Sequence, residues 1–173
     1  MSEKQYNIIY YHGLDSSLSQ EKRAILEKFG KVIAPTYEHR KAGAPEVIEA
    51  NFGAQPENTV LIGSSYGGFV AFKFSSTYDL PCLLFNPALP YRSIHDRETA
   101  PGSDIKNATY IVLGKNDEVI KCDDNLNFIY RHLNGPCEVS VENTMAHQVP
   151  KDVFEKHVSQ FFRLLNKSDS KRG

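Results

Sequence analysis

The chain has no tryptophan and only three cysteines among its 173 residues. Cys82, Cys122 and Cys137 are widely spaced and form no C-x-x-C pair. An odd number of scattered cysteines argues against a disulfide framework and against a zinc site. Packing is therefore the expected role of these side chains.

An excess of charge of one sign is also missing, because 20 Lys and Arg residues stand against 21 Asp and Glu residues. This balance gives no electrostatic basis for binding nucleic acid or an anionic membrane. No segment approaches the roughly 20 apolar residues that span a bilayer, and the N-terminus lacks the apolar core of a secretory signal. We expect a cytoplasmic protein that acts on a small molecule.

Short apolar runs alternate with longer helical patterns, which is the rhythm of a parallel sheet. The runs lack polar alternation, as expected of strands that helices cover on both faces. Strands are predicted at residues 6–11, 31–34, 59–62, 82–85, 109–113 and 137–141. Helices are predicted at residues 19–29, 45–52, 65–78, 123–133 and 151–165.

These elements predict one α/β domain over residues 1–166, with a doubly wound, mostly parallel six-stranded sheet and helices on both faces. The polar end of the chain, residues 167–173, is predicted to be disordered. Residues 86–106 contain three prolines and no clear periodicity, so they are expected to form a long loop.

The stretch GSSYG at residues 63–67 matches the pattern G-x-S-x-G with Ser65 at its centre. In α/β-hydrolases this motif is the nucleophile elbow, a sharp turn from a strand into a helix. Ser64 does not fit, because Ile62 and Tyr66 stand two positions away from it. An apolar run precedes the motif and a helical pattern follows it, which favours the elbow. The alternative for Ser65 is a helix N-cap.

A serine nucleophile needs a base to take its proton and a carboxylate to orient that base. In this fold the order along the chain is Ser, acid, His. Asp117 follows the fifth predicted strand, and His147 follows the sixth. Residues just beyond the carboxyl ends of parallel strands converge at one edge of the sheet. We therefore predict a catalytic triad of Ser65, Asp117 and His147.

Other assignments remain open for the acid and the base. Asp117 also suits a turn-stabilising residue, and three other carboxylates compete for its role: Glu118, Asp123 and Asp124. For His147 the alternative is a loop histidine that caps the next helix. The remaining histidines are worse placed. His132 and His157 fall in predicted helices, where we expect partly exposed positions, and His39 and His95 precede the acid.

Acyl transfer develops a negative oxygen, which two backbone N–H groups usually stabilise. The candidates are the N–H of Tyr66, after the nucleophile, and that of Leu14 in the loop YYHGLDSS. Gly13 would let the backbone approach the substrate, and His12 is expected to brace the loop. The alternative is a plain turn in which Asp15 or Ser16 caps the first helix.

With these motifs in order, the chain looks like a member of the α/β-hydrolase superfamily and resembles the small YqiA-type esterases. The resemblance runs from YYHGLDSS through LIGSSYGGF and LLFNPAL to VLGKNDEVI and MAHQV. It implies hydrolysis of esters or thioesters, with Ser65 as nucleophile, Asp117 as acid and His147 as base. It also suggests that Asn86 and Pro87 shape the pocket rim, although a strand-terminating turn is an alternative.

The chain has no insertion long enough for a cap domain, so we expect a minimal α/β-hydrolase fold with a shallow, open site. Such a site would accept small acyl groups, and residues 87–106 are the one candidate for a partial lid. We predict a serine esterase that works through an acyl-enzyme, without a metal or an organic cofactor.

Two alternatives are kept. An acyl-CoA thioesterase would use the same triad, and a basic rim would favour it; Lys73, Arg92, Arg97 and Lys115 are available, although a solvated surface explains them as well. A binding module that keeps the fold without significant catalysis is the other alternative. Reaction of Ser65 with a fluorophosphonate would distinguish the enzymes from the module.

Overall fold

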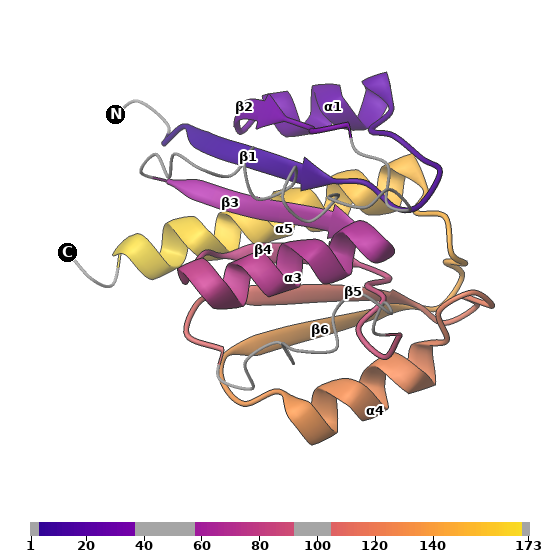
Figure 1. Cartoon of the computed structure of the whole chain (residues 1–173). Helices are drawn as coiled ribbons and strands as arrows, with labels where there is room; N and C mark the ends of the chain where they lie inside the picture. Colours follow the sequence, from indigo (N-terminus) through magenta and orange to yellow (C-terminus); the bar gives the residue numbers. More distant parts are fainter. Residues whose placement is uncertain (1–3, 37–57, 92–104, 171–173) are drawn as a thin grey trace.

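The computed structural model describes residues 4–36, 58–91 and 105–170, and its strands form one open sheet (Figure 1). All neighbouring strands run parallel, in the order β2-β1-β3-β4-β5-β6. The strands are β1 (Tyr6–Tyr11), β2 (Gly30–Ile33), β3 (Thr59–Ser64), β4 (Cys82–Phe85), β5 (Thr109–Gly114) and β6 (Cys137–Glu142). The predicted doubly wound α/β sheet is confirmed, and it is entirely parallel.

Four helices lie in the described ranges: α1 (Gln20–Glu27), α3 (Tyr66–Tyr78), α4 (Cys122–His132) and α5 (Lys151–Ser170). The helix predicted at residues 45–52 and most of the predicted lid lie outside the described residues. Ser19 precedes α1 as its N-cap, because its hydroxyl accepts a hydrogen bond of 3.3 Å from the N–H of Lys22.

The C-terminal end differs from the prediction, since α5 continues to Ser170 where we expected disorder from residue 167. No Pro or Gly interrupts the chain between Lys151 and Ser170, so nothing stops propagation of the helix. The low apolar content of residues 167–170 therefore did not predict that their backbone is helical.

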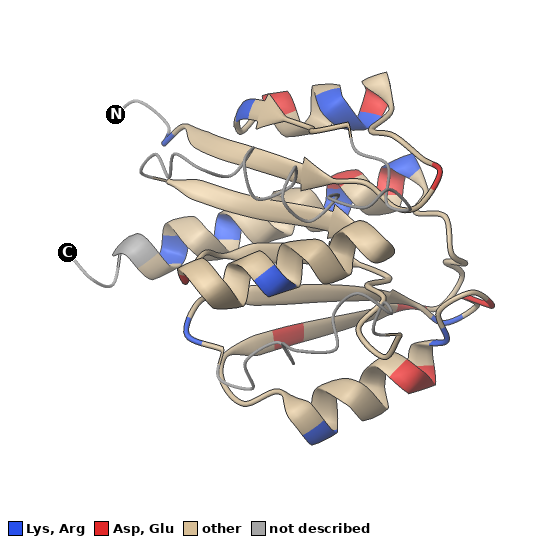
Figure 2. Ribbon diagram, viewed as in Figure 1, with Lys and Arg blue, Asp and Glu red and all other residues tan. Residues whose placement is uncertain are grey.

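Two hydrophobic cores cover the two faces of the sheet. Along β1, Ile8 and Tyr10 pack on the face covered by α1 and α5, whereas Ile9 and Tyr11 pack on the face covered by α3 and α4. This alternation follows from the period of two in a strand. Because both faces are buried, β3, β4 and β5 carry no charged residue, and Figure 2 shows the charges of both signs mainly on helices and loops.

The carboxyl ends of the strands lie at one edge of the sheet, opposite the edge at which the chain begins and ends (Figure 1). Hydrogen bonds join the loops at this edge, such as that from the N–H of Asn116 to the carbonyl of Met145, at 3.0 Å. In parallel sheets this edge is where ligands bind. Within the described part of the chain, no helix is long and apolar enough to cross a membrane.

Candidate active site

Ser65 stands at the junction of β3 and α3 in a strained backbone conformation, with φ at +56° and ψ at −123°. A positive φ is uncommon for a residue with a Cβ, and it persists only where the surroundings enforce it. Here the N–H of Ser65 donates to the carbonyl of Phe85 at 2.9 Å, and its carbonyl accepts from the N–H of Ala88 at 2.9 Å. The Ser65 side chain makes no capping hydrogen bond to α3. Its geometry therefore fits a nucleophile elbow better than an N-cap.

The two glycines of the motif let backbone segments touch at the elbow. A Cβ built on Gly67 would lie 2.1 Å from the carbonyl oxygen of Tyr11, and one on Gly63 would lie 2.2 Å from the carbonyl oxygen of Gly67. Real Cβ atoms do not approach backbone oxygens so closely. The spacing G-x-S-x-G is thus a packing requirement of this turn, and it brings α3 against the end of β1.

Ser64 belongs to β3 and has a different environment from Ser65. Its hydroxyl hydrogen-bonds to Tyr10, while burial raises the pKa of Tyr10 to about 12. Tyr10 belongs to the core on the face covered by α1 and α5. Of the two adjacent serines, only Ser65 lies in the turn itself.

Asp117 and His147 are brought together at the same edge of the sheet. Nδ1 of His147 lies 2.8 Å from Oδ2 of Asp117. The Asp117 side chain is fully buried, whereas 28% of the His147 side chain is exposed. If Nδ1 carries the proton that this carboxylate accepts, the other ring nitrogen, Nε2, is left as a base.

The second oxygen of Asp117 fixes the carboxylate to its own loop. Oδ1 accepts hydrogen bonds of 2.8 Å from the N–H groups of Val119 and Ile120. Asp117 can therefore stabilise its turn through Oδ1 and contact His147 through Oδ2, so the two roles do not exclude each other. The competing carboxylates are placed differently: Glu118 and Asp123 are exposed, and Asp124 accepts a hydrogen bond from the hydroxyl of Tyr91.

The loop after β1 passes directly beside Ser65. A Cβ built on Gly13 would lie 3.2 Å from Cβ of Ser65, so a side chain there would crowd the serine. His12 is buried, and its Nδ1 lies 2.7 Å from the carbonyl oxygen of Gly13. This contact supports the expected bracing role. Leu14 follows with 48% of its surface exposed, and Tyr66 is the first residue of α3.

Asn86, which we expected to shape the pocket rim, is buried beside the loop that carries His147. It is 1% exposed, and its side chain hydrogen-bonds to backbone groups of Gly114, Ala146 and His147. Pro87 is also buried and packs against the start of α3. The two residues that follow β4 are thus buried and pack against the segments that carry the candidate site residues.

One histidine was predicted wrongly. His157 is 1% exposed, although we expected a partly exposed position in its helix. Its Nδ1 lies 2.7 Å from the hydroxyl of Tyr110, and its Nε2 lies 2.6 Å from a carboxylate oxygen of Glu142. The apolar residues Phe154, Val158 and Phe161 on the same face of α5 are the signal that would have found it. His132 is exposed as expected, and His39 and His95 lie outside the described residues.

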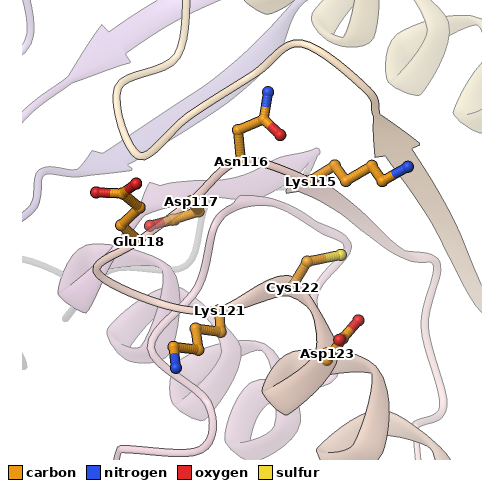
Figure 3. Close-up of a pocket in the computed structure, with 7 residues that line it drawn as sticks. All are labelled: Lys115, Asn116, Asp117, Glu118, Lys121, Cys122 and Asp123. Atoms are coloured by element: carbon orange, nitrogen blue, oxygen red, sulfur yellow. The ribbon is translucent and has the colours of Figure 1, made fainter.

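A pocket of about 540 Å³ lies beside the loop that carries Asp117 (Figure 3). Its lining residues are Lys115, Asn116, Asp117, Glu118, Lys121, Cys122 and Asp123. Two lysines and three carboxylates line it, so charges of both signs are present. Ser65 and His147 are not among its lining residues.

None of the three cysteines shows the lowered pKa of an activated thiol. Burial raises the pKa of Cys122, and it raises the pKa values of Cys82 and Cys137 to about 11, which favours the thiol over the thiolate. Across residues 4–36, 58–91 and 105–170, no group of three or more His, Cys, Asp or Glu side chains could hold a metal ion.

No hydrogen bond between described residues joins the hydroxyl of Ser65 to His147. The two residues are linked instead through the end of β4, where Phe85 accepts from the backbone of Ser65 and Asn86 donates to the backbone of His147. A catalytic hydrogen bond is often long without substrate and shortens only in the reacting complex.

Comparison with known proteins gives a family and a fold. The model of an uncharacterised protein family, UPF0227, matches residues 7–104, more than half of the chain. A search of curated proteins finds no match.

Several solved structures are similar over nearly the whole chain. The alpha/beta hydrolase domain-containing protein 10 from mouse has a TM-score of 0.74 and 14% identity, over 96% of this chain and 92% of its own. An alpha-beta serine hydrolase homologue from Coxiella burnetii has a TM-score of 0.70 and 16% identity, over 94% and 86%. Est1E from Butyrivibrio proteoclasticus has a TM-score of 0.70 and 13% identity, over 93% and 88%. At such identities the similarity shows the fold alone, which is that of the α/β-hydrolases.

Proposed function

This chain belongs to the UPF0227 family and has the α/β-hydrolase fold, and we propose that it is a serine hydrolase that cleaves carboxylic esters of small acyl groups. The observation that carries the proposal is the strained backbone of Ser65, held at the sheet edge where His147 hydrogen-bonds to Asp117 at 2.8 Å. An unstrained residue with a capping hydrogen bond would start the helix better than Ser65 does, so the strain at Ser65 is better explained by a catalytic role than by a structural one.

In the proposed reaction, the hydroxyl oxygen of Ser65 attacks the ester carbonyl carbon as Nε2 of His147 takes the hydroxyl proton. Asp117 orients the ring and stabilises its positive charge. The N–H groups of Tyr66 and Leu14 hold the negative oxygen of the tetrahedral intermediate. His147 then gives its proton to the departing alcohol, and an acyl-enzyme remains.

Deacylation repeats the same steps with water. Nε2 of His147 takes a proton from a water molecule, whose oxygen attacks the acyl carbon. The bond to Ser65 breaks, and the serine oxygen recovers its proton from His147. The proposal needs no metal or organic cofactor, because the charge of each intermediate is balanced by these groups.

The first test is labelling of the purified protein with a fluorophosphonate probe, followed by peptide mapping by mass spectrometry. We expect one adduct, on Ser65, which Ser65→Ala abolishes and His147→Ala reduces strongly. Ser64→Ala is the matched control, because it removes the neighbouring hydroxyl, and it should keep the adduct. A folded protein that gives no adduct on Ser65 would contradict the proposal and would favour a binding module.

The second test compares esters and thioesters that carry the same acyl group. The triad alone does not distinguish an oxygen from a sulfur leaving group, so an acyl-CoA thioesterase is the alternative that this test examines. The mixed charges around Asp117 give no particular support for a ligand that carries phosphates. We expect higher kcat/KM for short oxygen esters than for the matched CoA thioesters. Higher kcat/KM for the CoA thioesters would mean that the enzyme is a thioesterase and not an esterase.

A further inference from the structure

The Asn86 side chain binds three backbone groups, one at the end of β5 and two in the loop that carries His147. Its Oδ1 accepts a hydrogen bond of 2.7 Å from the N–H of Gly114, at the end of β5. Its Nδ2 donates to the carbonyl of Ala146 at 2.9 Å and to that of His147 at 3.0 Å. The Asn86 residue is 1% exposed; its bond to Gly114 is buried, and its bonds to Ala146 and His147 are part-buried.

From these contacts we propose that Asn86 is a positioning residue, which holds the backbone of His147 at the distance from Ser65 that proton transfer requires. This inference rests on the proposed function for the roles of Ser65 and His147. Asn86 itself touches no reacting atom and acts through the loop that carries the base.

The chemistry of the three partners requires an amide at this position. The N–H of Gly114 only donates, whereas the carbonyls of Ala146 and His147 only accept, so the amide orientation follows from its partners. A carboxylate would offer no N–H and would repel both carbonyls. An aliphatic side chain would remove all three hydrogen bonds and would leave the buried N–H of Gly114 without this partner.

The position of Asn86 next to the sheet explains how it links the backbone of His147 to that of Ser65. It follows Phe85, whose carbonyl accepts the hydrogen bond from the N–H of Ser65 at 2.9 Å. The N–H of Asn86 donates to Val112 in β5 at 2.9 Å, which fixes it to the neighbouring strand. Two consecutive residues at the end of β4 thus hold the backbones of Ser65 and His147.

The backbone conformation at position 86 also favours asparagine. Its φ is +41°, in the left-handed region that asparagine adopts more readily than most residues with a side chain. The same conformation admits glycine and aspartate. Asn86→Gly therefore removes the amide with little backbone strain, and Asn86→Asp keeps its size while removing both donors.

The experiment compares these two variants with the wild-type protein by thermal unfolding, by the labelling rate of Ser65, and by the NMR signal of the Nδ1 proton of His147. In folded variants we expect the labelling rate to fall about 100-fold, as for a reacting group displaced by about 1 Å. With ester substrate, kcat should fall while KM changes little. The proton signal of His147 should broaden or shift. Asn107 lies just before β5, and its side-chain amide donates to the carbonyl of Asp79 at the end of α3. Asn107→Ala, which loses this bond, is the matched control and should change none of these readouts.

Labelling within about twofold of wild type in folded Asn86→Gly, together with an unchanged His147 signal, would overturn the inference. If neither variant folds, hydrogen exchange of the Asn86 side-chain amide in the wild-type protein decides. Exchange slower than that of the exposed Asn127 supports the inference, and equal exchange overturns it. Should wild-type Ser65 not be labelled at all, the proposed function fails, while the His147 signal still tests whether Asn86 positions the ring.

Discussion

Nδ1 of His147 lies 2.8 Å from Oδ2 of Asp117, and the two side chains differ sharply in their access to water. The Asp117 side chain is fully buried, whereas the His147 side chain is 28% exposed. The carboxylate is therefore shielded from water, whereas part of the His147 side chain is open to it.

Asp117→Asn should slow the labelling of Ser65 by a factor on the order of 10⁴, which is typical of losing the acid of such a triad. The asparagine oxygen can still accept from Val119 and Ile120, but its NH₂ group then faces Nδ1 and favours the wrong tautomer of His147. The rate constant for fluorophosphonate labelling measures the effect. Asp124→Asn, a nearby carboxylate change, should leave that rate unchanged; a similar loss there would point to a general charge effect.

Gly13→Ala should lower the reactivity of Ser65 about tenfold while changing the melting temperature little. The added Cβ would lie 3.2 Å from Cβ of Ser65, so the loop after β1 must shift by a few tenths of an ångström. Labelling and thermal unfolding are measured on the same preparation. The exposed neighbour Ser17, changed to Ala, is the control. Parallel losses of reactivity and stability in Gly13→Ala would mean that the loop is only structural.

Gly67→Ala should destabilise the whole protein, with a loss of about 3 kcal/mol or more in the free energy of unfolding. Its Cβ would lie 2.1 Å from the carbonyl oxygen of Tyr11 and 2.4 Å from that of His12, and neither backbone segment can yield easily. Urea unfolding measures the change. Ser76→Ala, on the same helix, should cost far less. Wild-type stability in Gly67→Ala would mean that the elbow tolerates a side chain.

The parts of this molecule that follow from local pattern were predictable. Apolar runs without alternation indicate buried parallel strands, as β3, β4 and β5 are, and all six predicted strands are present. Ser65 follows from a five-residue motif, and Asp117 and His147 follow from their positions just after strands, because those positions meet at one sheet edge. The hydrogen bond between Asp117 and His147 is the contact that this reasoning expects.

The contacts of Asn86 and His157 could not be predicted in the same way, because they join distant segments. Asn86 binds His147 across 61 positions in the sequence, and no local pattern specifies that a polar residue after a strand turns inward. The apolar face of α5 indicates that His157 is buried, but only the fold shows that Tyr110 and Glu142, on two strands, contact its two ring nitrogens. Burial of a polar side chain depends on partners that only the fold supplies.

The cluster around His157 also determines how stability responds to acid. Burial lowers the pKa of His157 below its ordinary value of 6.5, although Glu142 opposes this. Hydrogen bonds from Lys156 and His157 lower the pKa of Glu142 below 4.5. Tyr110 completes the contacts of the ring, and Glu138 adds a further negative charge near Tyr110. In both titrating groups the unfolded chain binds its proton more readily than the folded chain does.

The free energy of unfolding should therefore fall in two stages on acidification. The first stage begins as the pH drops through 6.5, where histidine in the unfolded chain gains a proton that buried His157 resists. The second begins as the pH drops through 4.5, where glutamate in the unfolded chain gains a proton that Glu142 resists because Lys156 and His157 stabilise its carboxylate. Urea unfolding between pH 4 and pH 8 measures the slope. His157→Gln should flatten the first stage, because glutamine does not titrate, while His132→Gln, at an exposed position of α4, should leave it unchanged. An equal slope in wild type and His157→Gln would show that other groups produce the acid sensitivity.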